Sequence, residues 1–376
     1  MPDEPIPQSD PRAGILALRS RIEIAIIQVI ESGRYILGRE VQGFEQEFSA
    51  FVGVSHGVGA ANGTDALVLS LRALGVGAND YVVTVSHTAV ATVAAIELAG
   101  AKPLLVDIEP GTGTMSPRAL AEVLARPPGR IAVVMPVHLY GQPADLAQIE
   151  PAVKLAGATL VEDAAQAHGA LLGTRTVGSI GRVAAFSFYP TKNLGAIGDG
   201  GMVLTGDDGL AERLRALRQY GWRSRYVSDI TGVNSRLDEI QAAVLRVRLT
   251  MLEAENQRRR EIAAAYDSGL AGLPLQLPAR RADATHVFHQ YVIRTPQRDA
   301  LQRALAGRGI GTNIHYPVPV HLQPAYRGRL AIGPSGLAES EHAAREVLSL
   351  PMFPQLTEEH VGRVISAVHG AFANLE

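Results

Sequence analysis

The sequence predicts an α/β protein, with a mostly parallel sheet in a large domain followed by a smaller C-terminal α+β domain. Three observations lead to this fold class. From about residue 56, short apolar runs alternate with helix-like segments, which is typical of a parallel sheet covered by helices on both faces. A long helical pattern without Pro or Gly then runs from Ser235 to about Tyr266. Beyond it, the stretch 270–278 breaks the helical pattern, and the remaining chain combines one strand-like run with helix-like segments, as in a smaller α+β domain.

The apolar runs of the large domain have the length of buried strands, and segments such as 64–74 and 145–157 between them have helical periodicity. The most apolar long window, 89–106, contains Glu97, Lys102 and Pro103. It is therefore expected to be a helix followed by a strand and not a membrane span. The predicted strands are YVVTV (81–85), PLLVD (103–107), IAVVMP (131–136), ATLVED (158–163), VAAFSF (183–188) and GMVLT (201–205).

The pattern from Ser235 to Tyr266 predicts one connecting helix, with Ser235 as the N-cap and Asp238 and Glu239 in the first turn. The stretch 270–278 breaks this pattern. A strand is expected at 286–294, and helices are expected near 297–308 and 357–374. We therefore predict a large domain at 1–250, including N-terminal helices, and a small domain at 251–376.

Composition narrows the function classes. The chain has 376 residues, a formal net charge of −2 and no cysteine. The charge balance does not favour a nucleic-acid or membrane partner, and the absence of cysteine excludes disulfides, thiol nucleophiles and Cys-ligated zinc. No metal site is predicted. The N-terminus is polar and Pro-rich, unlike a signal peptide, so a cytoplasmic location is expected.

Polar stretches follow the apolar runs, at the sheet edge where open α/β folds bind ligands. Asn62, Gly63, Thr64 and Asp65 precede an apolar helix. Such a start is either a simple helix cap or a phosphate cradle made of free backbone N–H groups. Asp163 ends another strand, where a carboxylate caps a helix, binds a metal, acts as a base or pairs with a protonated ring nitrogen.

Lys192 ends the stretch FSFYPTK, and four glycines follow it in GAIGDGG (195–201). A lysine that attacks a carbonyl needs a lowered pKa, which an apolar setting supplies. A phosphate cradle, a buried acid and such a lysine together describe a site for pyridoxal 5'-phosphate (PLP), in which the acid keeps the pyridine nitrogen protonated.

With these residues in place, the sequence resembles the DegT/DnrJ-type nucleotide-sugar aminotransferases, which are fold-type I PLP-dependent enzymes of the aspartate aminotransferase superfamily. The resemblance spans most of the chain in family order. The matching stretches are NGTDAL (62–67), PVHLYGQPADL (136–146), VEDAAQAHGA (161–170), FSFYPTKNLGAIGDGG (186–201), GVNSRLDEIQAAVLR (232–246), IHYPVPVHLQPAY (314–326) and LSLPMFP (348–354).

The resemblance implies a role for each matching residue. Lys192 corresponds to the lysine that forms a Schiff base with PLP and moves the proton, and Asp163 to the partner of the pyridinium nitrogen. Gln166 would contact the ring hydroxyl of the cofactor. The implied phosphate ligands are Gly63, Thr64, Ser187 and, from the other subunit of a homodimer, Asn234.

The resemblance also implies substrate contacts from Tyr189, His315 and Tyr316, with His321 in the same loop. Arg223 and Arg225 either meet a nucleotide diphosphate or lie on a solvated loop. Where many relatives carry an aromatic residue that stacks on the pyridine ring, this chain has Ala89, so either the stack is lost or another side chain such as His87 covers the ring.

The resemblance therefore predicts transfer of an amino group from an amino acid, L-glutamate, to a nucleotide-linked keto-deoxysugar. The sugar expected is a dTDP-3-keto-6-deoxyhexose, as in deoxy amino sugar biosynthesis for lipopolysaccharides or antibiotics. A 4-keto sugar aminotransferase of the same family is the alternative. A sugar dehydratase is disfavoured by Lys192, because dehydratase relatives carry histidine there. A non-catalytic PLP-binding regulatory protein is the alternative from another class.

Overall fold

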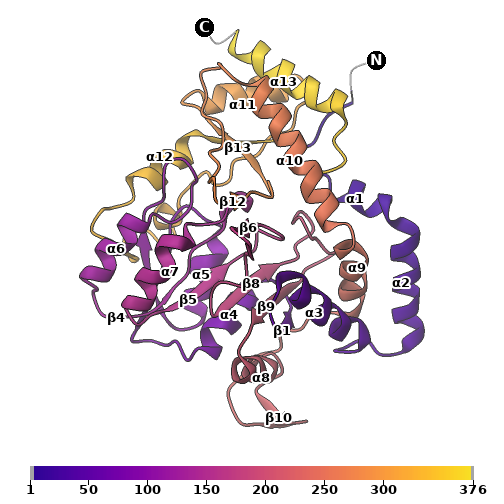
Figure 1. Ribbon diagram of the computed structural model, residues 1–376, viewed down its shortest axis with the longest axis vertical. Helices are drawn as coiled ribbons and strands as arrows, with labels where there is room; N and C mark the ends of the chain where they lie inside the picture. Colours follow the sequence, from indigo (N-terminus) through magenta and orange to yellow (C-terminus); the bar gives the residue numbers. More distant parts are fainter. Residues whose placement is uncertain (1–3, 374–376) are drawn as a thin grey trace.

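A mostly parallel sheet forms the centre of the large domain in the computed structural model, which describes residues 4–373 (Figure 1). All neighbouring strands pair in parallel except β9, which is antiparallel to both β1 and β8. The predicted fold class and its strands are thereby confirmed. In spatial order the 8-stranded sheet consists of β1 (His56–Ala60), β9 (Gly201–Thr205), β8 (Val183–Ser187), β5 (Thr159–Asp163), β4 (Arg130–Val134), β2 (Asp80–Val85), β3 (Lys102–Val106) and β14 (Ala331–Ile332).

Helices cover both faces of this sheet because consecutive strand residues point to opposite sides. Val83 packs with α6 (Pro117–Ala125) and α7 (Leu146–Leu155) on one face. Its neighbour Val82 packs with α4 (Gly63–Ala73), α5 (Val90–Leu98) and α8 (Asp208–Leu217) on the other. The predicted helices at 64–74 and 145–157 correspond to α4 and α7.

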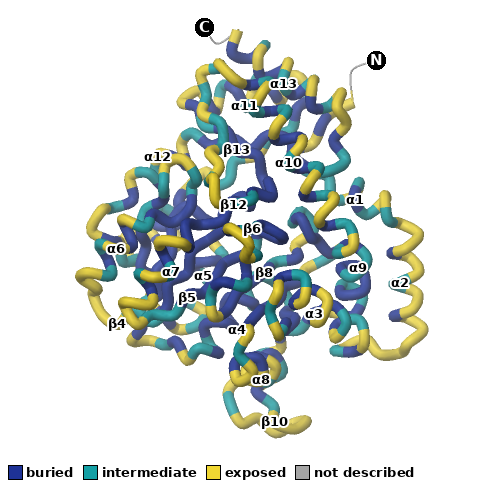
Figure 2. The backbone as a smooth tube through the Cα atoms, viewed as in Figure 1, coloured by how far each residue is buried: buried dark blue, intermediate teal, exposed yellow. Residues whose placement is uncertain are grey.

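Three N-terminal helices precede the sheet: α1 (Pro11–Ala17), α2 (Arg19–Ser32) and α3 (Arg39–Val52). Helix α3 packs against α9 (Glu239–Leu249) and buries Phe44 and Phe48 beside the sheet. Helix α2 lies at the margin of the molecule, and much of its surface is exposed (Figure 2).

The single connecting helix predicted from Ser235 is wrong in two respects. The chain forms two helices, α9 and α10 (Leu252–Gly269), which are interrupted at Thr250 and Met251. Ser235 lies outside both, because its hydroxyl donates to Asp65 Oδ2 at 2.7 Å and accepts from the N–H of Ala61. The residue before α9 is Asp238, and its side chain makes no capping bond.

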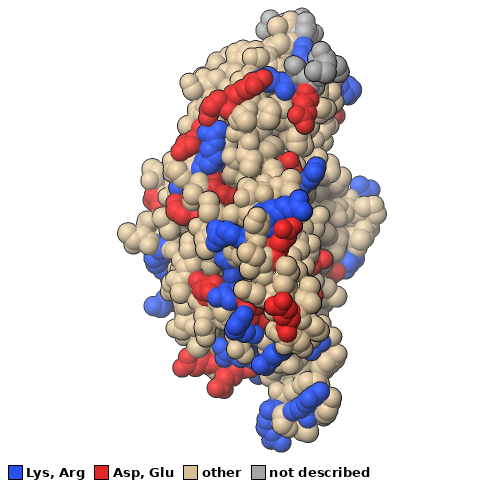
Figure 3. Space-filling model, turned by 90° about the vertical axis from the view of Figure 1, so that its right-hand side faces the viewer, with Lys and Arg blue, Asp and Glu red and all other residues tan. Residues whose placement is uncertain are grey.

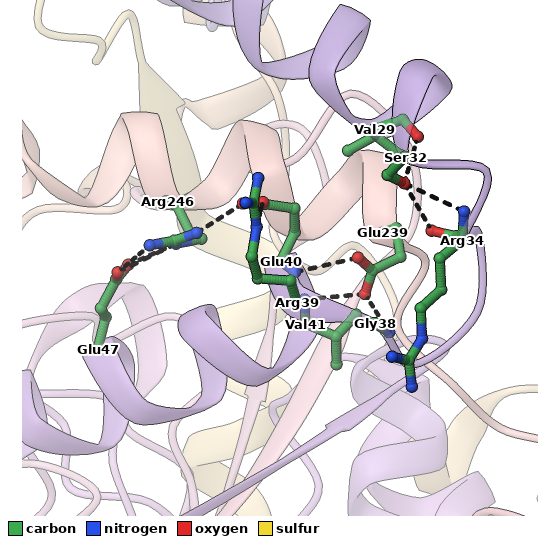
Figure 4. Close-up of polar contacts among 10 residues, drawn as sticks. All are labelled: Val29, Ser32, Arg34, Gly38, Arg39, Glu40, Val41, Glu47, Glu239 and Arg246. Atoms are coloured by element: carbon green, nitrogen blue, oxygen red, sulfur yellow. Dashed lines mark hydrogen bonds and ion pairs between the residues drawn. The ribbon is translucent and has the colours of Figure 1, made fainter.

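Glu239, at the first position of α9, caps a different helix (Figure 4). Its carboxylate accepts the backbone N–H groups of Gly38 (2.7 Å), Glu40 (3.0 Å) and Val41 (3.0 Å) at the start of α3. Nearby, the exposed Glu47 pairs with Arg246. The acidic residue predicted to favour its own helix therefore joins α9 to α3.

The C-terminal part forms a second core around α10, with α11 (Arg298–Ala306) and α13 (Glu358–Phe372) beside the strand pair β13 (Tyr291–Arg294) and β15 (Val347–Leu350). The two predicted helices are present, whereas the predicted strand 286–294 is regular only at 291–294. Strand β14, preceding α12 (Ala338–Glu346), joins the large sheet beside β3. The boundary at residue 250 stays a prediction.

Several short elements complete the fold. A hairpin of β10 (Trp222–Ser224) and β11 (Val227–Ser228) extends below α8 in Figure 1. Strands β6 (Leu171–Leu172), β7 (Arg175–Thr176) and β12 (Ala284–Thr285) form a small sheet, and η1 (Leu139–Gly141) and η2 (Val320–Leu322) are 3₁₀ turns.

The segment before α1 is fixed to the small domain. Ile6 forms a parallel bridge with Ile310, and the side chain of Gln8 donates to Gln290. The N–H of Met352 donates to the carbonyl of Gln8 at 3.0 Å. Among residues 4–373, no helix combines the length and apolar character that crossing a membrane requires.

Candidate active site

A cavity opens at the carboxyl ends of the parallel strands, where the sequence placed a ligand site. Asp163 is the last residue of β5, Ser187 is the last residue of β8, and Lys192 lies on the loop between β8 and β9. The structure thus brings together seven of the predicted site residues. The lining consists of Gly63, Thr64, Leu67, Thr88, Ala89, Ala91, Thr92, Val137, Asp163, Ala165, Gln166, Ser187 and Lys192.

One end of the cavity is the N-terminus of α4. Asn62 caps this helix, because its Oδ1 accepts the N–H of Asp65 at 2.8 Å. The preceding N–H groups of Gly63 and Thr64 lie before the first intrahelical bond, which is donated by Ala66 to the Asn62 carbonyl. A Cβ added to Gly63 would lie 2.6 Å from the Ser187 Cβ. The cap and the anion-binding geometry therefore coexist here.

Asp163 is a buried carboxylate, 4% exposed. Its Oδ2 accepts the hydroxyl of Thr92 at 2.8 Å, and its Oδ1 accepts the N–H of Ala165 at 3.3 Å. Burial raises the pKa of Asp163, and these two donors and the Lys192 amine counteract part of the rise. None of the bonded partners is a cation, so the carboxylate has the capacity to hold a protonated nitrogen.

The Lys192 amine also lies within the protein, although the residue as a whole is only half-buried. Burial lowers the pKa of Lys192 to about 8, and the carboxylate of Asp163 counteracts part of that fall. About a tenth of the amine is therefore uncharged and nucleophilic at pH 7, far more than for an ordinary lysine.

Gln166 has a defined amide orientation. The backbone N–H of Tyr140, which can only donate, contacts Gln166 Oε1 at 2.6 Å. The opposite end, Nε2, donates to the hydroxyl of Tyr316 at 3.1 Å. Burial raises the pKa of Tyr316 to about 12, so that hydroxyl stays protonated. The amide end of Gln166 that carries the N–H groups is therefore the end directed toward Tyr316.

Ala89 lines the cavity, whereas His87 does not. The His87 ring lies in a neighbouring cavity with Tyr140 and Arg294. Its Nε2 bonds the Tyr140 hydroxyl at 2.8 Å, and that hydroxyl donates to the carbonyl of His315. Burial lowers the pKa of His87 to about 4, and Arg294 adds to the fall. The structure thus places His87 behind Tyr140 instead of over the cavity.

The residues predicted to contact the substrate lie in different surroundings. Tyr189 is exposed, three residues before Lys192. His315 bonds Ser349 Oγ through Nδ1 at 2.8 Å, and burial, followed by the charge of Lys192, lowers its pKa to about 4. His321 is engaged elsewhere, because its ring nitrogens contact Ser86 Oγ (2.7 Å) and Glu341 Oε1 (3.3 Å).

Three further predicted residues, Asn234, Arg223 and Arg225, also lie outside the cavity of their own chain. Asn234 is exposed, in an antiparallel bridge with Gln219. Arg223 and Arg225 lie on and beside the exposed strand β10, where Arg223 pairs with Asp229 and Arg225 covers the ring of Tyr226. The corresponding lower tip of the molecule is basic, while both charge signs are interspersed over the rest of that face (Figure 3).

Sequence reasoning missed two buried polar residues that are adjacent in sequence to the predicted Asp163 and Lys192, namely Glu162 and Asn193. Glu162 is fully buried and accepts four donors: His138 Nε2 and the N–H groups of Gly178, Ile180 and Gly181. Burial raises the pKa of Glu162, but these donors outweigh it and hold the pKa below its usual value. Asn193 is buried beside Lys192. Adjacent polar residues in EDAAQ and TKN were the only signal available.

The residues present fit pyridoxal phosphate. The glycine and hydroxyl groups at the α4 N-terminus suit a phosphate, since a side chain at position 63 would occupy that space. The buried Asp163 carboxylate suits a protonated ring nitrogen, and the Lys192 amine suits an aldehyde carbon.

Comparison with known proteins agrees with this geometry. A sequence model of the DegT/DnrJ/EryC1/StrS aminotransferase family matches residues 17–369. The chain is 49% identical to the dTDP-3-amino-3,4,6-trideoxy-alpha-D-glucose transaminase of Streptomyces venezuelae over 365 residues, covering 96% of this chain and 95% of that protein. It is 42% identical to the UDP-N-acetyl-3-dehydro-alpha-D-glucosamine 3-aminotransferase of Acidithiobacillus ferrooxidans over 363 residues, covering 96% and 97%.

The fold is similar to a crystal structure of S. venezuelae DesV in complex with a ketimine intermediate. The TM-score is 0.94 at 48% sequence identity, and the match covers 98% of this chain and 99% of that chain. The overall fold of the chain is therefore one that has been observed experimentally.

Proposed function

Because this chain belongs to the DegT/DnrJ/EryC1/StrS aminotransferase family, we propose that it aminates a nucleotide-linked keto-deoxysugar with L-glutamate as the amino donor. The protein is a PLP-dependent aminotransferase. The sugar we propose is a dTDP-3-keto-6-deoxyhexose, because the similar S. venezuelae protein is named for a dTDP-3-amino sugar and the A. ferrooxidans protein for 3-amination.

The observation that carries this proposal is the meeting of Lys192, Asp163 and the α4 N-terminus in one cavity. When bound, pyridoxal phosphate supplies an electron sink that stabilises negative charge at the carbon bearing the amino group. The residues that would hold it are Gly63, Thr64 and Ser187 at the phosphate, Asp163 at the ring nitrogen and Gln166 at the ring oxygen.

The protein's own groups then perform the remaining tasks. The Lys192 Nζ would hold the cofactor at its aldehyde carbon, and it would move the proton at the amine-bearing carbon of the substrate. Its lowered pKa lets it act as a base near neutral pH. Asp163, fixed by Thr92 and Ala165, keeps a proton on the ring nitrogen. Tyr189, His315 and Tyr316 are the proposed contacts to the sugar.

A substrate panel tests the proposed reaction. The protein is incubated with PLP, L-glutamate and dTDP-, UDP- and GDP-linked 3-keto and 4-keto sugars, and the amino sugar is identified by mass and NMR. The expected product carries the amino group at C3 of a dTDP-linked 6-deoxyhexose. Amination at C4 alone would favour the other branch of the family, and failure to consume glutamate would require another donor.

The non-catalytic regulatory alternative is separated from catalysis by borohydride reduction. A catalyst of the proposed kind loses its visible cofactor absorbance on reduction. The reduced cofactor then remains covalently attached, and peptide mass spectrometry finds it on Lys192. A protein that binds PLP without a covalent bond to Lys192 would release the cofactor when it is unfolded after reduction.

We also propose a homodimer with shared active sites. Ile24, Ile27 and Ile30 of α2 are 57%, 51% and 55% exposed, and apolar side chains at this spacing form a stripe that a second copy of the chain would cover. The exposed positions of Asn234, Arg223 and Arg225 leave them free to reach the phosphate and nucleotide groups bound to the partner.

A further inference from the structure

A buried pair of amides lies beside Lys192. Asn193 is 2% exposed, and Asn256 of α10 is fully buried. Asn193 Nδ2 donates to Asn256 Oδ1 at 2.8 Å and to the carbonyl of Val287 at 2.9 Å. Asn256 Nδ2 donates to the carbonyl of His168 at 2.8 Å. Because carbonyl groups can only accept, the orientation of both amides is fixed.

The same network fixes the protonation of a neighbouring histidine. Both N–H groups of Asn193 are used, so its Oδ1 is an acceptor, and His289 Nδ1 contacts it at 3.3 Å. His289 must therefore carry its proton on Nδ1. Burial, followed by the charge of Lys192, lowers the pKa of His289, so the ring is neutral. No member of the network carries a charge.

The pair joins the two loops that carry the reactive groups. Asn193 is the neighbour of Lys192, and His168 belongs to the turn that begins at Asp163. A Cβ at Gly169 would lie 2.8 Å from Asn256 Nδ2, so this turn approaches the amide as closely as glycine allows. At the other end of the lysine loop, Arg248 Nη1 donates to the carbonyl of Gly195 at 2.7 Å.

We infer that Asn193 and Asn256 are positioning residues that set the placement of Lys192 relative to Asp163. The inference rests on the role proposed for Lys192. Neither amide lines the cavity, so they act through the backbone on either side. Without the pair, the lysine loop loses its attachment to α10 and to the aspartate turn, and the amine gains access to water.

The pH dependence of bond formation between Lys192 and added PLP tests this inference. The amine must be uncharged to attack, so the rate rises with pH through its pKa. In the full-length cofactor-free protein, the midpoint is expected near 8. In Asn256→Ala and Asn193→Ala it should rise by about one unit, because hydration of the amine restores part of its ordinary pKa. The double variant should shift no further than either single variant, since the pair acts as one unit.

Thr205→Val is the matched control. It removes the two hydrogen bonds of the Thr205 hydroxyl, which donates to the carbonyl of Arg182 (2.9 Å) and accepts from the N–H of Asp207 (3.2 Å), at the end of the strands away from the cavity. Its midpoint should equal that of the wild type even if its melting temperature falls. Asn256→Ser is the milder variant to use if Asn256→Ala does not fold.

Unchanged midpoints in folded variants of both asparagines would overturn the inference, as would an equal shift in Thr205→Val. Failure of the proposed function looks different. In that case the wild type forms no bond to PLP, or Lys192→Ala forms it equally well.

Discussion

At the scale of single residues, replacing Lys192 with alanine should abolish turnover and leave the protein folded. The change removes both the nucleophile and the proton carrier, while a half-buried side chain contributes little to stability. Turnover, melting temperature and visible cofactor absorbance are measured together. Lys192→Arg is the control, since it keeps a positive charge but offers no neutral amine, and it should be equally inactive. Near-wild-type turnover in either variant would refute the assignment.

Asp163→Asn should bind the cofactor yet lose turnover by orders of magnitude, because an amide does not hold a proton on the ring nitrogen. Its neighbour Glu162 provides the contrast. Glu162→Gln should lower the free energy of unfolding by about 1–3 kcal/mol, since one acceptor of buried donors becomes a donor itself. Turnover and unfolding are measured for both variants. If Asp163→Asn stays active, Asp163 is structural.

The sequence predicts a site residue when the residue type and its immediate neighbours in sequence are enough to indicate a role. Lys192 and Asp163 follow apolar strands, and their types suit the reaction, so each was predictable. The role of Asn256 was not predictable, because it depends on a hydrogen bond from Asn193, which is 63 positions away in sequence. His87 shows the same limit: its neighbours in sequence suggested the cavity, but its ring bonds to Tyr140 and turns away.

At the scale of elements, the cap that Glu239 forms on α3 should be worth measurable stability. Glu239→Gln keeps the size of the side chain but removes a charge that accepts three backbone N–H groups at a helix start. The free energy of unfolding should fall by about 1–3 kcal/mol, measured by chemical unfolding.

Glu47→Gln is the control for that experiment, on the same surface (Figure 4). It removes an exposed ion pair with Arg246, which should change stability by less than about 1 kcal/mol. Equal effects of the two substitutions would mean that the cap adds nothing beyond an ordinary surface charge.

Helical segments could be predicted better than the residues at which they begin, break and end. The pattern from Ser235 to Tyr266 contains no Pro or Gly, so nothing local marks the break at Thr250 and Met251. Ser235 is a good N-cap residue, but its hydroxyl bonds Asp65 near the start of α4 instead. At Ser235, a contact with a distant part of the chain prevails over local preference.

At the scale of the whole molecule, two inactive variants should restore each other if the active sites are shared. Lys192→Ala is mixed with Asn234→Glu, whose added charge should repel the cofactor phosphate. In a mixed dimer one pocket carries both defects and the other carries neither. With random exchange about half the dimers are mixed, so about a quarter of wild-type turnover should return.

Subunit exchange is verified separately, by mass spectrometry of differently labelled subunits. Exchange without any return of turnover would show that Asn234 serves its own chain or no site at all. Each variant alone, taken through the same mixing procedure, is the control.

Six of the eight strands in the large sheet, but not the glycine-containing β1, were predictable because each is a short apolar run in the sequence. Strand β14 was not, since Ala331 and Ile332 are only two residues, and they pair with β3 across more than 200 positions of sequence. The bridge between Ile6 and Ile310 is likewise a short pairing between residues that are far apart in sequence.

That bridge also matters for how the chain is made. Residues 6–8 are translated long before their partners at 290, 310 and 352. At ordinary synthesis rates this wait lasts roughly 15–60 s. Ile6 is 2% exposed in the folded chain, but throughout that time the residues that bury it are not yet present. Strand β3 likewise lacks its neighbour β14. A nascent chain truncated before residue 310 would therefore carry a loose N-terminal segment and an open sheet edge, two features that chaperones and proteases recognise.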